Sequence, residues 1–248
     1  MGQAITACIA DDPNLVLTVA LESKDHPKIG RFANEDEEVC ISSDFDSKDA
    51  DVFIDFSTPL ASIELISKCS KDGIPMVIGV TGFSKDDDSR IAEAARDIAI
   101  MAEPNMSIGA NVIFHVIEYV ARVMKNFDAE VFEAHHRNKK DAPSGTALRL
   151  GEVIAWTRGQ EFDKVAVFDR NGKDCARKKG EIGFSVMRGG DIVGEHRVLF
   201  ANDGEQLEIV HRATGRKHFV MGALLACDFV AEATPGLYDM RDVIEGIY

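Results

Sequence analysis

The sequence predicts an α/β protein with two domains: a doubly wound parallel sheet with helices on both faces, followed by an α+β domain with a mixed sheet. Up to residue 105, short apolar runs alternate with helical patterns, as in a parallel sheet whose strands are connected by helices. After residue 105, one long apolar helix pattern precedes a series of strand patterns with little helix between them.

The composition is globular, with a strongly acidic balance. The 248 residues are 45% hydrophobic and carry a formal net charge of −14, so we expect no nucleic-acid partner. We also expect no membrane association, because no apolar run approaches the length of a membrane span, and no signal peptide is recognisable. The five cysteines are scattered without a C-x-x-C pair, which favours free thiols in a reducing cytoplasm.

The first half predicts four buried strands. The spacing of Ile5, Cys8 and Ile9 predicts a first helix, and the continuous apolar run 15–21 predicts a strand buried on both faces. Residues 23–50 are polar, and we expect loop with one short strand there. The later strands and the helices between them are predicted, in chain order, at 51–56, 59–71, 74–79, 84–97 and 98–102.

The second half predicts one long helix and five strands. The apolar pattern of residues 111–127 suits a helix that connects domains or forms an oligomer contact. Asn202-Asp203-Gly204 predicts a hairpin turn, because Asp-Gly tolerates positive φ angles. A final helix is predicted at about 217–233, and the single tryptophan, Trp156, is expected in the core. The strand patterns lie at 129–134, 164–168, 182–187, 192–200 and 205–213.

Functional groups are concentrated in the segment EAHHRNKKDAPSGTA (133–147), which begins within the last two residues of the strand pattern at 129–134 and continues as a loop. Adjacent His135 and His136 are followed by Lys139, and cations gathered in one loop repel one another unless an anion binds there. Histidine titrates near neutral pH, so His135 is a candidate for proton transfer.

The loop ends at a predicted helix N-terminus. Ser144, Gly145 and Thr146 provide a side-chain cap and exposed amides, and a helix N-terminus binds carboxylate or phosphate groups. We therefore predict a small anionic substrate that carries carboxylates, held by His136, Lys139 and these amides.

Other interpretations of these histidines remain. A pair of adjacent histidines is often part of a surface loop without a chemical role. We expect no metal site, because cationic neighbours repel a divalent cation and Glu133 is the sole acidic residue beside the pair. His196 and His211, on predicted strands, are either structural or close to the substrate.

The same loop resembles the signature of the dihydrodipicolinate reductases, nicotinamide-dependent enzymes of the diaminopimelate pathway to lysine. Other blocks resemble the family in the same order, so the resemblance covers nearly the whole chain: DVFIDFSTP, MVIGVTGF, PNMSIGANV, GDIVGEH and LYDMRDV. It implies hydride transfer from NAD(P)H to the cyclic dicarboxylate (hydroxy)dihydrodipicolinate, giving tetrahydrodipicolinate. It also implies a homotetramer, a Rossmann-like domain at 1–106 and 217–248, and a substrate-binding and tetramerisation domain at 107–216.

The resemblance implies a role for each matching residue. His135 matches the general acid, and Lys139 matches the lysine that assists it. The residues that match the binders of the substrate carboxylates are His136, Lys139, Ser144, Gly145 and Thr146. The residues that match the cofactor-binding positions are Met1, Gly2, Glu22, Gly79, Val80, Thr81, Glu103, Pro104, Asn105 and Met106.

The start of the chain departs from the family pattern. The family has a first strand and a glycine-rich G-x-x-G-x-M-G turn before the first helix, whereas this sequence begins at the final Met1-Gly2 of that turn. We therefore expect a truncated start, with apolar surface uncovered on 15–21 and 51–56. The alternative is a weakly active or silent oligomer that binds dicarboxylates.

Cofactor preference is partly predictable. Glu22 favours the 2′-hydroxyl of NAD, and Ser23 stands where the family has an arginine that assists with a 2′-phosphate, although Lys24 could substitute. We expect NADH to be at least as good as NADPH. A different two-domain dehydrogenase of amino or keto dicarboxylates would share Glu22 and GVTGF, but it has no reason to carry HHRNKKDAPSGT.

Overall fold

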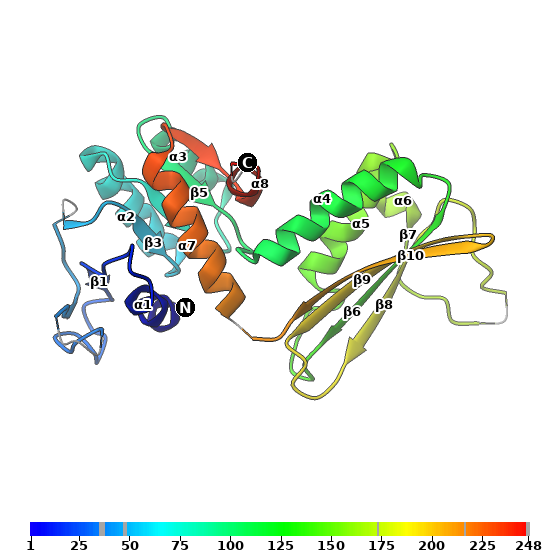
Figure 1. The fold of residues 1–248 in the computed structure, drawn as a ribbon, viewed down its shortest axis with the longest axis horizontal. Helices are drawn as coiled ribbons and strands as arrows, with labels where there is room; N and C mark the ends of the chain where they lie inside the picture. The colour runs from blue at the N-terminus through cyan, green and yellow to red at the C-terminus, as the bar shows by residue number, and fades with distance from the viewer. Residues whose placement is uncertain (35–37, 47–48, 173, 216, 247–248) are drawn as a thin grey trace. The chain divides into compact units, whose positions relative to one another are not determined.

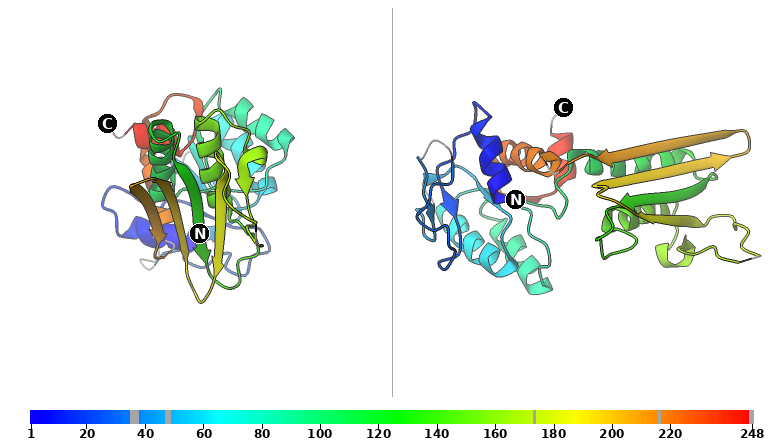
Figure 2. Two further views of the ribbon diagram at one scale, coloured as in Figure 1. Left: turned by 90° about the vertical axis from the view of Figure 1, so that its right-hand side faces the viewer. Right: turned by 90° about the horizontal axis from the view of Figure 1, so that it is seen from below.

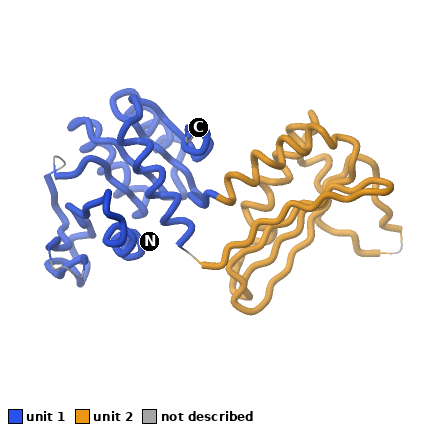
Figure 3. Tube along the Cα trace, in the orientation of Figure 1, with its two compact units in different colours: residues 1–108, 217–248 blue, residues 109–216 orange. Residues whose placement is uncertain are grey.

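Figure 1 presents a computed structural model of the chain, which describes residues 1–34, 38–46, 49–172, 174–215 and 217–246. Figure 2 gives two further views of the same ribbon. The chain folds into two compact units, one of residues 1–108 with 217–248 and one of residues 109–216 (Figure 3). The chain therefore leaves the first unit once and returns to it at the start of the last long helix.

The first unit is built on a four-stranded parallel sheet. Its strands, in spatial order, are β11 (Gly236–Tyr238), β5 (Ala99–Ala102), β4 (Met76–Ile78) and β3 (Phe53–Asp55). Side chains of α2 (Pro59–Asp72) and α3 (Lys85–Ala94) pack on one face, and those of α7 (Lys217–Glu232) and α8 (Met240–Glu245) pack on the other. This arrangement confirms the predicted doubly wound α/β fold.

Local signals set the boundaries of the helices in this unit. The Thr58 side chain caps the start of α2, and Gly73, at φ 74°, closes it in the left-handed conformation that glycine adopts readily. Ser84 and Asp87 form a capping box at the start of α3. These boundaries confirm the helices predicted from the sequence.

The predicted strand at 15–21 is wrong for most of its length. Only Ala20 and Leu21 form a strand, β1 (Ala20–Leu21), which pairs with β2 (Ile41–Ser42) in a separate two-stranded sheet. A strand persists only where a neighbour supplies hydrogen bonds, and an apolar run does not specify that neighbour. Val16 is 79% exposed, as expected for uncovered apolar surface.

The second region expected to be uncovered, β3, is largely covered. Phe53 is buried, and Ile54 and Phe56 pack against the cluster in which α1 (Gly2–Ala10) contacts α7 through Ile5 and Leu224. The first helix thus forms where its spacing predicts it. Strand β11 was missed because three residues are too few to show a period.

The second unit is a five-stranded mixed sheet covered by helices. Its strands, in spatial order, are β10 (Glu205–Ala213), β9 (Gly194–Asn202), β6 (Asp128–His135), β8 (Ile182–Arg188) and β7 (Ala166–Val167). The pairs β10–β9 and β9–β6 are antiparallel, whereas β6–β8 and β8–β7 are parallel. Helices α4 (Ile108–Val123) and α5 (Gly145–Thr157) bury the core face of this sheet. The mixed sheet confirms the predicted α+β class.

Two details of this unit differ from the sequence-based expectations. Trp156 is 69% exposed, because α5 turns Ala147, Leu150 and Ile154 towards the sheet instead. The predicted strand 164–168 begins as the short helix α6 (Phe162–Val165) and continues as β7. The predicted hairpin is confirmed, since Asn202 pairs with Glu205 and Gly204 has φ 89°.

Gly222 provides a test of the packing in the first unit. A Cβ at this position of α7 would overlap the carbonyl oxygen of Met106, a backbone atom that cannot rotate away. We predict that Gly222→Ala lowers the free energy of unfolding by about 1–3 kcal/mol, as measured by urea titration. The matched control is Gly2→Ala, a helical glycine with open space around it, which should not destabilise the protein. Equal stability of Gly222→Ala and the wild type would contradict this packing.

Candidate active site

Pairing within the sheet of the second unit lines up three polar residues on its core face. Glu133 of β6 is directly opposite His196 of β9, and His196 is directly opposite His211 of β10. Side chains alternate between the two faces of a strand, so Glu133 and His135 project to the same face, which they share with buried Val131 and Val198. This row lies where β6 ends and the basic loop begins.

Glu133 is the centre of the cluster. Its carboxylate is 1% exposed and accepts hydrogen bonds from the backbone N–H of Ser144 at 2.9 Å and from the Arg188 guanidinium at 2.7 and 2.8 Å. It also bonds Nδ1 of His135 at 2.6 Å. Burial opposes ionisation of Glu133, but the bonds from Arg188, His135 and Ser144 outweigh it and lower its pKa.

His135 is almost fully buried beside this carboxylate. Burial lowers its pKa, the charges of Lys139 and Arg188 act in the same direction, and together they outweigh the opposite effect of Glu133. An ideal Cβ on Gly194 would lie 3.1 Å from Nε2 of His135, so a side chain at this position of β9 would crowd the His135 ring. The lowered pKa therefore favours the neutral form of the His135 ring.

Ser144 joins the cluster to helix α5. It is the N-cap residue, and its Oγ accepts from the backbone N–H of Ala147 at 3.3 Å and lies 3.0 Å from Nε2 of His196. Burial lowers the pKa of His196 to about 4, so His196 is neutral at physiological pH. The sequence-based prediction of a capped helix start at Ser144 is confirmed.

The structure places the other loop residues around this cluster. Lys139 Nζ forms an ion pair with Asp141 at 2.9 Å, and this contact lowers the pKa of Asp141. His136 is partly buried, and its carbonyl oxygen accepts from the N–H of Lys139 at 3.1 Å. Gly145 and Thr146 form the first turn of α5. The predicted substrate-binding residues thus lie on one loop and the helix start that follows it.

Two residues that the sequence did not single out as catalytic hold this site. Arg188, at the end of β8, bonds Glu133 and the carbonyl oxygen of Asp141, at 2.6 Å. His196 contacts Ser144, and its ring centroid lies 5.2 Å from that of His135. Arg188 lies 55 residues further along the chain than Glu133. Only the parallel register of β6 and β8 brings the two residues together, and this register could not be predicted from the sequence.

In the first unit, the predicted cofactor residues follow the carboxyl ends of neighbouring strands. Gly79, Val80 and Thr81 follow β4, and the Gly79 N–H donates to the carbonyl oxygen of Asp55 at 2.8 Å. The residues Glu103, Pro104, Asn105 and Met106 follow β5 in the same way. The N–H of Glu103 donates to the carbonyl oxygen of Ile78 at 3.0 Å, so the two loops lie side by side.

The remaining predicted cofactor residues lie elsewhere in the first unit. Glu22 directly follows β1, and its carboxylate is exposed, 4.0 Å from the His26 ring. Met1 is the N-cap of α1, and Gly2 is the first residue of that helix. Loops at the carboxyl ends of parallel strands fit a nucleotide, as does a carboxylate able to accept hydrogen bonds from ribose hydroxyls. One oxygen of Asp55, buried at the end of β3, has no hydrogen-bond partner among the described residues.

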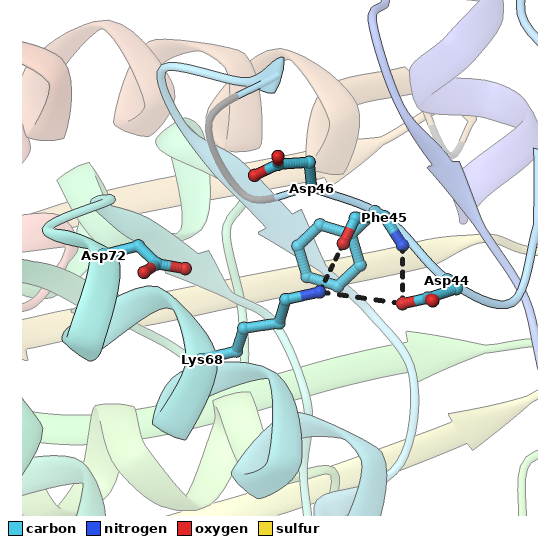
Figure 4. A pocket seen from close by; sticks show the side chains of 5 residues that line it. All are labelled: Asp44, Phe45, Asp46, Lys68 and Asp72. Atoms are coloured by element: carbon cyan, nitrogen blue, oxygen red, sulfur yellow. Dashed lines mark hydrogen bonds and ion pairs between the residues drawn. The ribbon is translucent and has the colours of Figure 1, made fainter.

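Among the described residues, no cluster of three or more metal-binding side chains occurs, and no helix is long and apolar enough to cross a membrane. A surface hollow in the first unit is lined by Phe45, Lys68 and three aspartates (Figure 4). Its lysine is already engaged, bonded to the carbonyl oxygen of Phe45 and 3.7 Å from Asp44.

Comparison with known proteins gives matches along nearly the whole chain. The family model for the N-terminus of dihydrodipicolinate reductase matches residues 1–106, and that for the C-terminus matches residues 109–244. The 4-hydroxy-tetrahydrodipicolinate reductase of Nitrosomonas eutropha is 47% identical, over 98% of this chain and 94% of its own length. The enzyme of that name from Geotalea uraniireducens is 44% identical, with the same shares of the two chains.

Solved structures share the fold. A dipicolinate-bound dihydrodipicolinate reductase from Paenisporosarcina sp. TG-14 matches with a TM-score of 0.78 and 24% identity, over 96% of this chain and 92% of that chain. A probable dehydrogenase from Thermotoga maritima matches with a TM-score of 0.60 and 9% identity, over 98% of this chain and 90% of that one. With two family models spanning both units and relatives of high identity, the chain belongs to the dihydrodipicolinate reductase family.

Proposed function

We propose that this chain is a 4-hydroxy-tetrahydrodipicolinate reductase, which transfers a hydride from NAD(P)H to the cyclic dicarboxylate of the diaminopimelate pathway. The observation that carries the proposal is the hydrogen-bonded group of His135, Glu133 and Ser144, beside a lysine and a helix N-terminus. Such a group combines a proton donor with a carboxylate-binding surface, as reduction of an anionic ring requires. Among the described residues, nothing favours the alternative of a silent dicarboxylate-binding oligomer.

The substrate carboxylates would be held by the loop and the start of α5. Lys139 would exchange its ion pair with Asp141 for one with a substrate carboxylate, and His136 would assist from the same loop. Ser144, Gly145 and Thr146 present the N-terminal turn of α5, where the helix dipole favours negative charge. The same cations would stabilise negative charge that develops on the ring during the reaction, so they lower the barrier as well as bind.

His135 would supply the proton. The arriving dicarboxylate brings negative charge next to an imidazole whose pKa burial and neighbouring cations hold low, and this raises the pKa and protonates the ring. The imidazolium then donates its Nε2 proton to the substrate carbon adjacent to the one that receives the hydride. Lys139 keeps the site positively charged when that proton leaves.

The cofactor would be held by the first unit. The loops Gly79–Thr81 and Glu103–Met106, the exposed Glu22 and the helix start at Met1 and Gly2 are the groups we assign to it. The reduced nicotinamide, when bound, supplies the hydride. We further propose that the protein acts in the cytoplasm as a homotetramer assembled through the second unit, where Val186, Met187 and Val210 are exposed on the sheet.

His135→Gln tests the proton donor. We predict that kcat falls about 100- to 10,000-fold, because glutamine keeps a polar side chain but cannot donate a proton as an acid. Binding of dipicolinate, measured by calorimetry, should change little. His115→Gln on α4 is the matched control and should keep wild-type turnover. A His135→Gln protein with more than a tenth of wild-type kcat would exclude His135 as the general acid.

The pH dependence tests the charge state of His135. Activity requires the protonated ring, so it falls as pH rises through the His135 pKa. In the free protein that pKa is lowered by burial, and bound dicarboxylate raises it. We predict that the midpoint of this fall lies at lower pH for kcat/KM, which reports the free protein, than for kcat, which reports the complex. Coincident or reversed midpoints would contradict the assignment.

Cofactor preference tests Glu22 and Ser23. We predict that kcat/KM for NADH equals or exceeds that for NADPH, because Glu22 repels a 2′-phosphate. Ser23→Arg should raise the NADPH-to-NADH ratio of kcat/KM by about tenfold, corresponding to roughly 1.4 kcal/mol of interaction with the added phosphate. Ser89→Arg, at an exposed position of α3, is the control and should leave the ratio unchanged. A strong NADPH preference of the wild type would contradict the role of Glu22.

A further inference from the structure

The Glu133 carboxylate has its hydrogen-bonding capacity fully used. It is 1% exposed and takes part in four hydrogen bonds, two with Arg188, one with His135 and one with Ser144. An ionised carboxylate has about four lone-pair directions, all as acceptor. Glu133 therefore has no capacity left for the substrate, and its effect on the reaction must pass through its partners.

The first consequence concerns the tautomer of His135. A carboxylate that also accepts from Arg188 and from a backbone N–H is ionised, so the atom of His135 that faces it must carry the hydrogen. Neutral His135 therefore holds its proton on Nδ1. Nε2, which lies next to Gly194, is then the atom that gains and releases the exchangeable proton.

The second consequence concerns helix α5. The same carboxylate accepts from the N–H of Ser144, and the Ser144 hydroxyl caps the helix through Ala147. One side chain thereby holds both the proton-donating ring and the start of the carboxylate-binding helix. Arg188 also donates a hydrogen bond to the carbonyl oxygen of Asp141, which lies in the loop between His135 and Ser144.

From this geometry we propose that Glu133 is a positioning residue, which fixes the proton-donating nitrogen of His135 and the start of α5 relative to each other. The proposal rests on the proposed function for its effect on turnover. Glu133 itself touches neither substrate nor cofactor, so it acts as the partner that orients a reacting group.

The charged groups around His135 predict in which direction each substitution should move the His135 pKa. Glu133 on β6 favours the imidazolium, whereas Lys139 on the loop and Arg188 on β8 disfavour it. Asp141 forms an ion pair with Lys139. The other titratable groups on this face are His196 on β9, whose ring contacts that of His135, and His211 on β10, whose ring stacks on that of His196. Removing the charge of Glu133 should therefore lower the His135 pKa, and removing that of Arg188 should raise it. A merely structural role predicts no such opposition.

The test follows the nitrogen resonances of His135 by NMR during pH titration of the full-length protein, in the wild type, Glu133→Gln and Arg188→Gln. We expect the neutral wild-type ring to carry its proton on Nδ1. In Glu133→Gln, the amide oxygen must face the Ser144 N–H and the NH₂ group must face His135, so the neutral ring should switch to the Nε2–H form. The His135 pKa should fall in Glu133→Gln and rise in Arg188→Gln.

Turnover gives the second measurement. We expect kcat of Glu133→Gln to fall about 10- to 100-fold, with the pH midpoint for kcat/KM moving down, and that midpoint to move up in Arg188→Gln. Glu130→Gln is the matched control, because Glu130 lies on the same strand and is also paired with arginine, at 2.9 Å from Arg170. It should leave the tautomer and pKa of His135 unchanged.

The outcomes separate the two proposals. An Nε2–H tautomer in the wild type would overturn the positioning role even if no variant folds. Within the variants, an unchanged pKa in Glu133→Gln, or shifts in one direction for both variants, would also overturn it. Failure of the proposed function would give a different result. The wild-type protein would then show the expected tautomer but would not oxidise NADH when the cyclic dicarboxylate is added.

Discussion

A carboxylate buried at the end of β6 is the constraint on which the site depends. Taking the charge of Glu133 out of water is unfavourable unless donors surround it, and those donors come from separate parts of the chain. Arg188 ends β8, Ser144 starts α5, and His135 closes β6 itself. The hydrogen bonds to this one buried charge therefore bring together the end of β8, the start of α5 and the His135 ring.

The sheet makes this arrangement possible through its pairing. In β6, Glu133 and His135 face the same side as the core residues, so the strand passes from an apolar core to a polar site without a change of face. Gly194 on the neighbouring strand leaves room for the ring. The helices that bury the rest of this face are α4 and α5, and the second of these begins within the site. The face of the sheet that packs against α4 and α5 therefore also carries the candidate site.

Much of the fold could be predicted from the sequence because its signals are local. The capped start of α2 at Thr58 and the Asp-Gly turn before β10 depend on a few neighbouring residues. The failures depend on distant partners. The run 15–21 looks like a buried strand, but most of it has no strand beside it, and Trp156 faces outwards because other residues of α5 fill the core.

The candidate site also combines features that are local in the sequence with features that depend on distant residues. The histidines, Lys139 and the helix start are contiguous in the sequence, so their proximity could be predicted from their order, and the anion-binding surface with a proton donor stays a prediction. The roles of Arg188 and His196 depend on the register of β6 with β8 and β9, which no local pattern reveals. Glu133 was visible in the sequence as an acidic neighbour of the histidines, but its bonds to two other elements were not.

We expect this chain to reduce a cyclic dicarboxylate with a nicotinamide cofactor. The most direct measurement follows NADH absorbance and ring product together after the protein is mixed with NADH and (hydroxy)dihydrodipicolinate. We predict that one NADH is oxidised for each tetrahydrodipicolinate formed, and that no NADH is oxidised when the dicarboxylate is left out. Absence of dicarboxylate-dependent NADH oxidation by the folded protein would contradict it.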